Sequence, residues 1–218
     1  MGLLTPLSIS ITSWHPLTSC TARSVSDRII VQFRLVCEVS TIKHATFGAG
    51  CFWGVEEIFC KLPGIAATRV GYMGGTIGNP TYDDVCTDTT GHVDVVQVSY
   101  DPSRISYDDL LDVFWQLHDP TSMDDQGPYE QGSQYRAVVF AHDPDQDAAA
   151  RASKAALERS GVYRTPIVTE IRAATRFWPA EDHHQRYIQK GGTHHCNVFN
   201  RTVTFPAEGK AERPAQSR

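Results

Sequence analysis

The sequence GHVDVVQVSYDPSRISYDDLLDVFWQLH, residues 91–118, contains a strand pattern followed directly by a helix pattern. In residues 91–101, Val93, Val95 or Val96, Val98 and Tyr100 stand in near-alternation, which is typical of a strand. From Ser106 the period changes, because a capping serine is followed by apolar residues at 110, 111, 113, 114 and 117. This spacing predicts an amphipathic helix over 106–118.

The same change of pattern recurs on both sides of this stretch. Further strands are predicted at 44–50, 65–75, 134–142 and 166–174, and further helices at 52–61, 143–161 and 179–192. Asp143 and Pro144 mark the start of the longest helix, because Asp caps helices and Pro fits the first turn. Alternating strands and helices predict an α+β fold, a mixed sheet with helices packed on it, in one domain over 44–206.

The composition excludes several classes of protein. The chain has 218 residues, of which 41% are hydrophobic, and this is enough for one core. A net charge of −5 gives no basic field for nucleic acid or an anionic membrane surface, and no apolar run is long enough for a transmembrane helix. Six cysteines without a CxxC motif favour a reducing compartment, so we expect a cytoplasmic protein.

The two ends of the chain differ from its centre. Residues 1–43 are rich in Ser and Thr and contain no acidic residue before Asp27. We interpret them as an N-terminal extension. It is a disordered segment, an organelle-targeting segment, or the result of a start codon assigned too far upstream. Residues 207–218 are interpreted as a polar C-terminal tail.

A cysteine stands at the start of the helix predicted in GAGCFWGVEEIFCK, residues 48–61. Cys51 there is a candidate nucleophile, because unpaired N–H groups and the helix dipole favour the thiolate. Gly50 and Gly54 on either side allow another chain segment or a ligand to approach closely. The alternative is that Cys51 only fills space in the core, which is how we interpret Cys60 and Cys86.

Histidines suggest two other kinds of site. A Cys–His hydrolase or acyltransferase would use Cys51 as the nucleophile and His184 or His92 as the base. A metal site would draw on His183, His184, His194, His195 and Cys196. The metal site is disfavoured, because adjacent histidines on a helix point about 100° apart and do not share a site.

Seven blocks in order carry a family resemblance. They are GCFWG (50–54), GYMGG (71–75), NPTYDDVC (79–86), TGHVDVVQVSYDP (90–102), FWQLHDPT (114–121), GSQYRAVVF (132–140) and AEDHHQRY (180–187). In this set the chain resembles the A-type peptide methionine sulfoxide reductases. The resemblance implies a two-layer α/β sandwich with a ferredoxin-like core. It also implies a monomer that reduces the S epimer of methionine sulfoxide, free or in proteins, with thioredoxin as partner and without metal or organic cofactor.

The resemblance also implies roles for particular residues. Cys51 would attack the sulfoxide sulfur and become a sulfenic acid. Phe52 and Trp53 would form the apolar seat of the substrate's methyl group. Tyr82 and Tyr135 match the two tyrosines whose hydroxyls hold the sulfoxide oxygen.

The chain departs from the family pattern at its two carboxylates. The proton donor is normally Glu and is Asp94 here, whereas the assisting carboxylate is normally Asp and is Glu130 here. We expect Asp94 and Glu130 to act as a coupled pair with Asp94 as the donor. An added residue in QGPYEQG, 126–132, leaves Asp124 and Asp125 as alternative counterparts.

A second thiol is needed to reduce the sulfenic acid. Cys196, the last cysteine of the chain, is the expected resolver, and Cys86 is the alternative. A catalytically altered paralogue that only binds methionine-rich segments is a third possible function.

Overall fold

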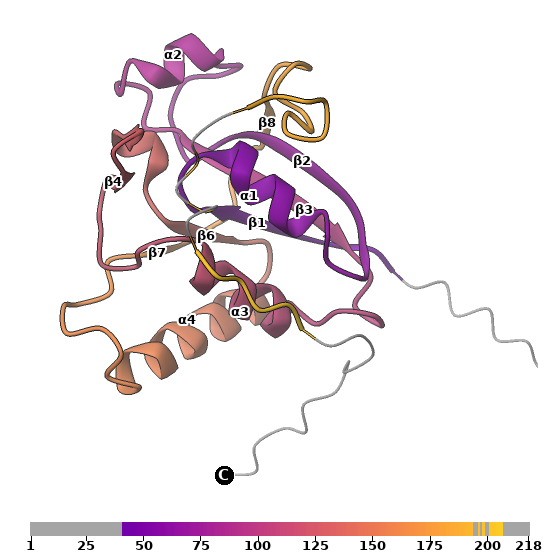
Figure 1. The fold of residues 1–218 in the computed structure, drawn as a ribbon, viewed down its shortest axis with the longest axis vertical. Coiled ribbons are helices and arrows are strands. Elements are labelled where there is room, and N and C mark those ends of the chain that lie inside the picture. Colours follow the sequence, from indigo (N-terminus) through magenta and orange to yellow (C-terminus); the bar gives the residue numbers. More distant parts are fainter. Residues whose placement is uncertain (1–40, 194–195, 197, 199–200, 207–218) are drawn as a thin grey trace, which may run out of the picture. The chain divides into compact units, whose positions relative to one another are not determined.

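The computed structural model describes residues 41–193, 196, 198 and 201–206, all of which belong to one compact unit, Val39–Arg218. Figure 1 shows this unit as a ribbon. Residues 1–40 and 207–218 lie outside the described residues, so the boundaries of the predicted extension and tail stay predictions.

A six-stranded sheet in the order β7-β6-β1-β3-β2-β8 forms the centre of the unit. Its strands are β1 (Lys43–Gly48), β2 (Ile65–Met73), β3 (Val93–Tyr100), β6 (Val138–Ala141), β7 (Glu170–Ala173) and β8 (Trp178–Pro179). Neighbours are antiparallel except β6 and β7, which are parallel and joined through helix α4 (Pro144–Arg159). The predicted mixed sheet is therefore confirmed.

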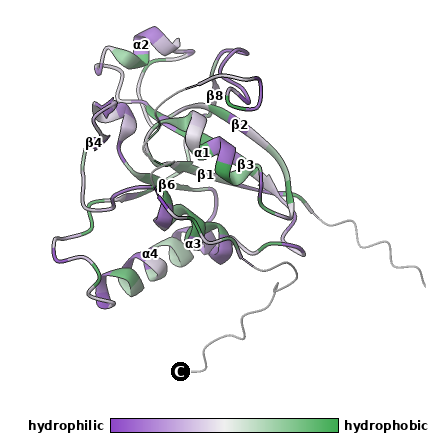
Figure 2. Cartoon of the chain, in the orientation of Figure 1, coloured by the Kyte–Doolittle hydropathy of each residue, from purple (hydrophilic) through white to green (hydrophobic). Residues whose placement is uncertain are grey.

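Helices cover one face of this sheet. α1 (Phe52–Phe59) lies over β1 and β3 in Figure 1, while α3 (Tyr107–Leu117) packs beside α4. The Phe47 ring of β1 stacks on Phe59 of α1 at 5.2 Å between centroids and on Phe114 of α3 at 5.1 Å. One core thus joins both helices to the sheet, and Figure 2 shows the hydrophobic side of α3 turned towards it. This agrees with the expected α+β class of packed helices on a sheet.

The alternation in β3 buries both of its faces. Val93 and Val95 belong to a small cluster with Met73 and Phe140 on one side. Val96 and its alternating neighbours face the helices, together with Asp94, since successive side chains of a strand point to opposite faces. The strand pattern therefore places an acidic residue in the interior beneath α1.

The helix caps agree with the sequence. The Ser106 side chain accepts a hydrogen bond from Asp109 N at 3.1 Å, and the Asp143 side chain accepts one from Gln146 N at 2.8 Å. Pro144 occupies the first turn of α4. The predicted starts of both helices are confirmed.

The helix predicted at 179–192 is wrong. After β8 the chain forms a series of turns, and Arg186 has φ 52, a left-handed conformation that a helix does not allow. Arg186 N donates to the buried Glu56 carboxylate at 2.8 Å, and the Gln185 side chain binds both main-chain groups of Val70. These long-range hydrogen bonds compete with the helical i→i−4 hydrogen bonds, and the spacing of apolar residues in the sequence does not predict them.

Short elements around the site also escaped prediction. They are α2 (Tyr82–Cys86), β4 (Asp125–Gly127), β5 (Glu130–Gln131), η1 (Ser133–Tyr135) and β8. The strand expected over 166–174 is regular only in β7. Elements of two to five residues are too short to show a period.

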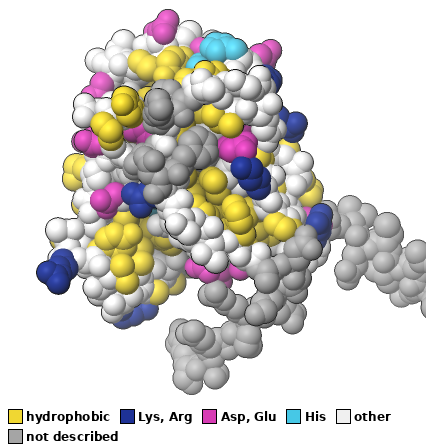
Figure 3. All heavy atoms as spheres, in the orientation of Figure 1, with side chains coloured by type: hydrophobic (Ala, Val, Ile, Leu, Met, Phe, Trp, Pro, Cys, Tyr) yellow, Lys and Arg dark blue, Asp and Glu magenta, His cyan; other side chains and the backbone are white. Residues whose placement is uncertain are grey.

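Helix length and the distribution of charge can be described for the same residues. Within the described residues, every helix is too short or too polar to cross a lipid bilayer. On the face shown in Figure 3, acidic and basic side chains are interspersed.

Candidate active site

Cys51 lies where the chain passes from β1 to α1. It is the N-cap of α1, as predicted, and its side chain is 5% exposed. Gly50 before it has φ +88, and a Cβ there would collide with the Glu130 carboxylate. Glycine is therefore required at position 50 for both conformation and space.

Cys196 lies directly against Cys51. The two Sγ atoms are 3.3 Å apart and share a hydrogen bond, and Cys196 is 2% exposed. A Cβ on Gly54 would come within 2.7 Å of Cys196 Cβ and would also collide with Val198. The predicted close approach at Gly50 and Gly54 is confirmed, and at Gly54 the approaching segment is the one that carries Cys196.

The pKa of Cys51 contradicts the expectation of a favoured thiolate in this arrangement. The hydrogen bond shared with Cys196 raises this pKa most, followed by burial and by the nearby charges of Cys196, Glu130 and Asp94. A helix dipole contributes at most about 2 kcal/mol even in a partly buried setting, and α1 has only eight residues. With Cys196 in contact, Cys51 is held as a thiol.

Asp94 projects from β3 into the same region. Its side chain is 2% exposed, and Oδ1 is buried without a hydrogen-bond partner among the described residues. Burial, and after it the charge of Glu130, raises the pKa of Asp94 well above its usual value. The site therefore favours the protonated form of Asp94, and Oδ1 is the oxygen left without a partner among the described residues.

Glu130 approaches Cys51 from another element. It begins β5, is 2% exposed, and its Oε2 accepts a hydrogen bond from Cys51 N at 3.1 Å. Asp124 and Asp125 on the same hairpin are exposed, and Asp125 Oδ1 accepts from Gly127 N at 2.7 Å. Of the three carboxylates considered as the partner of Asp94, the structure places Glu130 beside Cys51.

Aromatic side chains surround this cluster. Phe52 is buried and Trp53 half-buried, with ring centroids 6.1 Å apart. Burial raises the pKa of both the Tyr82 and the Tyr135 hydroxyl. Both hydroxyls therefore remain protonated donors near Asp94.

Two residues support these aromatic side chains: Glu181 had no role in the sequence analysis, and His184 was considered there only as a hydrolase base or a metal ligand. Glu181 accepts hydrogen bonds from Tyr82 N at 2.9 Å and from the Tyr72 hydroxyl at 3.0 Å. His184 Nδ1 accepts from the Trp53 indole N–H at 3.1 Å. Both residues lie in the block AEDHHQRY, and the match of this block to the family was the sign in the sequence that they belong to the site.

The arrangement contradicts the Cys–His hydrolase. His184 Nδ1 accepts from Trp53, and the ring nitrogens of His92 are engaged by Gly75 N at 3.2 Å and Ile77 O at 2.8 Å. Among the described residues no hydrogen bond joins either ring to Cys51, and His184 Nε2 has no hydrogen-bond partner. Such an enzyme needs a histidine within hydrogen-bond reach of the nucleophile. Here the sulfur of Cys51 is instead hydrogen-bonded to the Cys196 thiol and lies near two buried carboxyl groups, those of Asp94 and Glu130.

The other cysteines and histidines do not join this site in the same way. Cys86 is exposed on α2, so its interpretation as core filler is wrong, while Cys60 is half-buried. Within the described part of the chain no three potential metal ligands come together. His194 and His195, two members of the metal set considered above, lie outside the described residues.

Comparison with known proteins supports one family. The family model described as peptide methionine sulfoxide reductase matches residues 43–212. "Peptide methionine sulfoxide reductase MsrA" of Methanoculleus marisnigri is 56% identical over 158 residues, which cover 72% of this chain and 96% of that protein. The protein of the same name from Geobacter sulfurreducens is 53% identical over 159 residues, covering 73% and 98%.

Solved structures agree with this result. Reduced Mxr1 from Saccharomyces cerevisiae superposes with a TM-score of 0.69 at 31% identity, over 76% of this chain and 94% of that one. Methionine sulfoxide reductase A of Corynebacterium diphtheriae gives 0.62 at 35% identity, over 68% and 74%. The predicted fold class is confirmed by both.

Proposed function

The chain belongs to the peptide methionine sulfoxide reductase family, and on this premise we propose that it reduces the S epimer of methionine sulfoxide, free or in proteins, to methionine. The predicted oxidoreductase class is confirmed by relatives that share more than half of their residues with this chain. The observation that carries the proposal is the Cys51–Cys196 contact of 3.3 Å beside two buried carboxyl groups.

The first step is an oxygen transfer at Cys51. Its sulfur attacks the sulfoxide sulfur, and the oxygen ends on Cys51 as a sulfenic acid while methionine leaves. In this structure Cys196 Sγ donates a hydrogen bond to Cys51 Sγ. The substrate therefore has to displace Cys196, and this removes the largest cause of the raised Cys51 pKa.

Asp94 supplies the proton for this step. A sulfoxide oxygen leaves only when protonated, and a carboxyl group that is neutral near pH 7 is the required acid. Burial favours that form of Asp94, and its Oδ1, which has no hydrogen-bond partner among the described residues, would donate to the substrate oxygen. The Tyr82 and Tyr135 hydroxyls would hold the same oxygen.

Glu130 and the aromatic rings position the reactants. Glu130 holds Cys51 N at 3.1 Å and so orients the start of α1. Phe52 and Trp53 give the methyl group an apolar seat that also excludes water from Asp94.

Two further steps regenerate the Cys51 thiol. Cys196 attacks the sulfenic sulfur, a disulfide forms and water leaves. We assign this role to Cys196 because it is in contact with Cys51, whereas Cys86 is exposed on α2. A thioredoxin then reduces the Cys51–Cys196 disulfide. A cytoplasmic location and a monomeric state belong to the same proposal.

Single-turnover kinetics on the two separated sulfoxide epimers tests the proposal. We expect one methionine per enzyme from the S epimer without thioredoxin, many with thioredoxin, and none from Cys51→Ser. A Cys51–Cys86 disulfide after one turnover would overturn the choice of resolver. No release from either epimer would overturn the function and favour a binding module.

A further inference from the structure

The segment that carries Cys196 is attached to the protein at several points. Before Cys196, Gly192 N donates to Tyr187 O at 3.0 Å. At the site itself, Cys196 and Val198 pack on Gly54. After the site, the main chain of Thr204 is bound by the side chain of Gln116 on α3.

The Gln116 contact resembles one rung of a sheet. Gln116 Oε1 accepts a hydrogen bond from Thr204 N at 2.7 Å, and Nε2 donates to Thr204 O at 3.3 Å. Nε2 also donates to Asp112 O one turn earlier on α3, at 2.8 Å. That bond fixes the orientation of the amide before the segment binds, so little side-chain entropy is lost on binding.

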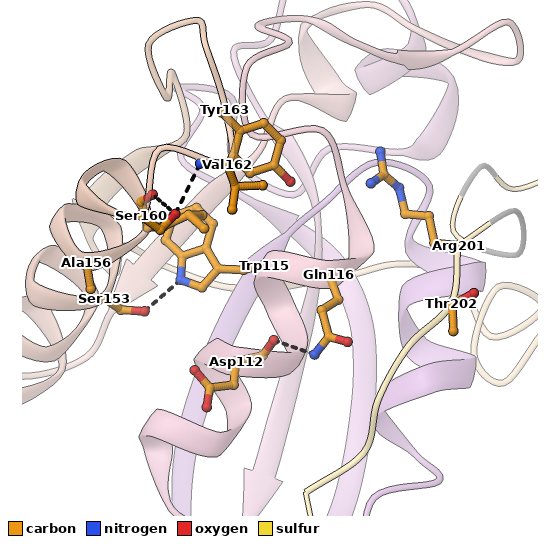
Figure 4. A pocket seen from close by; sticks show the side chains of 11 residues that line it. Asp112, Trp115, Gln116, Ser153, Ala156, Ser160, Val162, Tyr163, Arg201 and Thr202 are labelled. Carbon is orange, nitrogen blue, oxygen red and sulfur yellow. Dashed lines mark hydrogen bonds between the residues drawn. The ribbon is translucent and has the colours of Figure 1, made fainter.

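Next to the Gln116 contact, the described part of the segment borders a cavity. A cavity of about 740 Å³ lies between α3, α4 and the residues Arg201 and Thr202. Figure 4 shows Trp115 and Tyr163 on one side of this cavity and Arg201 across from them on the segment. Beyond the cavity, Val203 is partly buried against the core next to the Gln116 contact.

These attachments must respond differently when substrate enters. Cys196 contacts Cys51 and packs with Val198 on Gly54, so a sulfoxide at Cys51 has to displace Cys196. The bond between Gln116 of α3 and Thr204 of the segment involves none of the residues that react with the sulfoxide. It remains available to hold the segment while Cys196 is away from Cys51.

We propose that Gln116 is a positioning residue for the resolving step: its amide holds Thr204 and keeps Cys196 within reach of the Cys51 sulfenic acid. The inference rests on the proposed function. Cys196 thiol and Cys51 sulfenic acid give the disulfide and one water, so the sulfenic sulfur is reduced as the thiol is oxidised. A segment held at both ends samples a smaller volume than one held at Gly192 alone, which raises the effective concentration of the thiol.

The test separates the two chemical steps. Gln116→Met keeps the length of the side chain and removes both bonds to Thr204. We expect methionine release in the first turnover to stay within about two-fold of the wild type. Disulfide formation should slow about ten-fold, the order expected for loss of one or two hydrogen bonds. A sulfenic-acid-specific diketone should then trap more Cys51.

A second pair of variants approaches the same bond from the segment. Thr204→Pro removes the N–H that Gln116 accepts, and Thr204→Val is the matched control that keeps it. We expect Thr204→Pro to slow disulfide formation as Gln116→Met does, with no further slowing when both are combined.

Two outcomes would overturn the inference. One is disulfide formation at the wild-type rate in Gln116→Met, and the other is a parallel fall in methionine release, which would mean that Gln116 acts through the fold. A wild-type enzyme that releases no methionine would instead refute the proposed function.

Discussion

Asp94 and Glu130 reach the same site from very different parts of the molecule. Asp94 is on β3, which is hydrogen-bonded to β1 and β2 along both edges. Glu130 is on the two-residue strand β5, which pairs with β4 alone in a separate small sheet. The regular strand supplies the buried acid, whereas the hairpin supplies a carboxylate that contacts the nucleophile's backbone. The two carboxylates are thus equally buried, but only Asp94 has a rigid support.

The largest expected effect separates the roles of these two carboxylates. Asp94→Asn keeps the shape of the side chain and removes the proton, so the sulfoxide-reduction step should slow by about 10²- to 10⁴-fold, the usual contribution of a general acid. Single-turnover methionine release measures it. If Asp94→Asn keeps the wild-type rate while Glu130→Gln abolishes the step, the assignment is reversed.

Glu130→Gln should have a smaller effect. Its amide oxygen still accepts from Cys51 N, so we expect a loss of about ten-fold, as for a weakened charge-assisted hydrogen bond. The charge of Glu130 also raises the pKa of Asp94. Without that charge Asp94 loses its proton at lower pH, so the alkaline limb of the pH–rate profile should shift to lower pH. An unmoved limb would show that the two groups are not coupled.

The same contrast explains what the sequence predicts. β3 and α3 follow from alternation and from a capped helical period, and Cys51 was placed correctly at the start of α1. The turns around Arg186 and the β4–β5 hairpin depend on bonds between distant residues, such as Arg186 N to Glu56. The raised pKa of Cys51 also depends on one such contact, with Cys196. Local patterns do not encode these partners.

The exchanged side-chain lengths give a third prediction. Asp94→Glu adds a methylene to a side chain that is 2% exposed, and such overpacking should slow the reduction step about ten-fold. The double variant Asp94→Glu/Glu130→Asp restores the family's order of lengths, and we expect it to be faster than the product of the single effects predicts. Purely additive effects in the single-turnover rates would show that the lengths are independent.

Asp94 should also make the fold less stable as pH rises. Its pKa is raised in the folded state, so the folded protein binds a proton more tightly than the unfolded chain. The stability that this tighter proton binding provides is fully present below the pKa of the unfolded chain, about 3.9. It is lost as pH rises towards the pKa of the folded state, by about 1.4 kcal/mol for each pH unit between the two pKa values. Asp94→Asn removes this dependence, because an amide does not titrate.

Denaturant unfolding of the wild type and Asp94→Asn from pH 5 to pH 8 measures that difference. We expect the variant to gain stability relative to the wild type as pH rises, even though it has lost the reduction step. Gln97→Ala, which is half-buried on the same strand and removes no titratable group, should run parallel to the wild type. A constant difference between wild type and Asp94→Asn would mean that Asp94 titrates normally in the folded state, and the neutral acid in the proposed mechanism would then lose its basis.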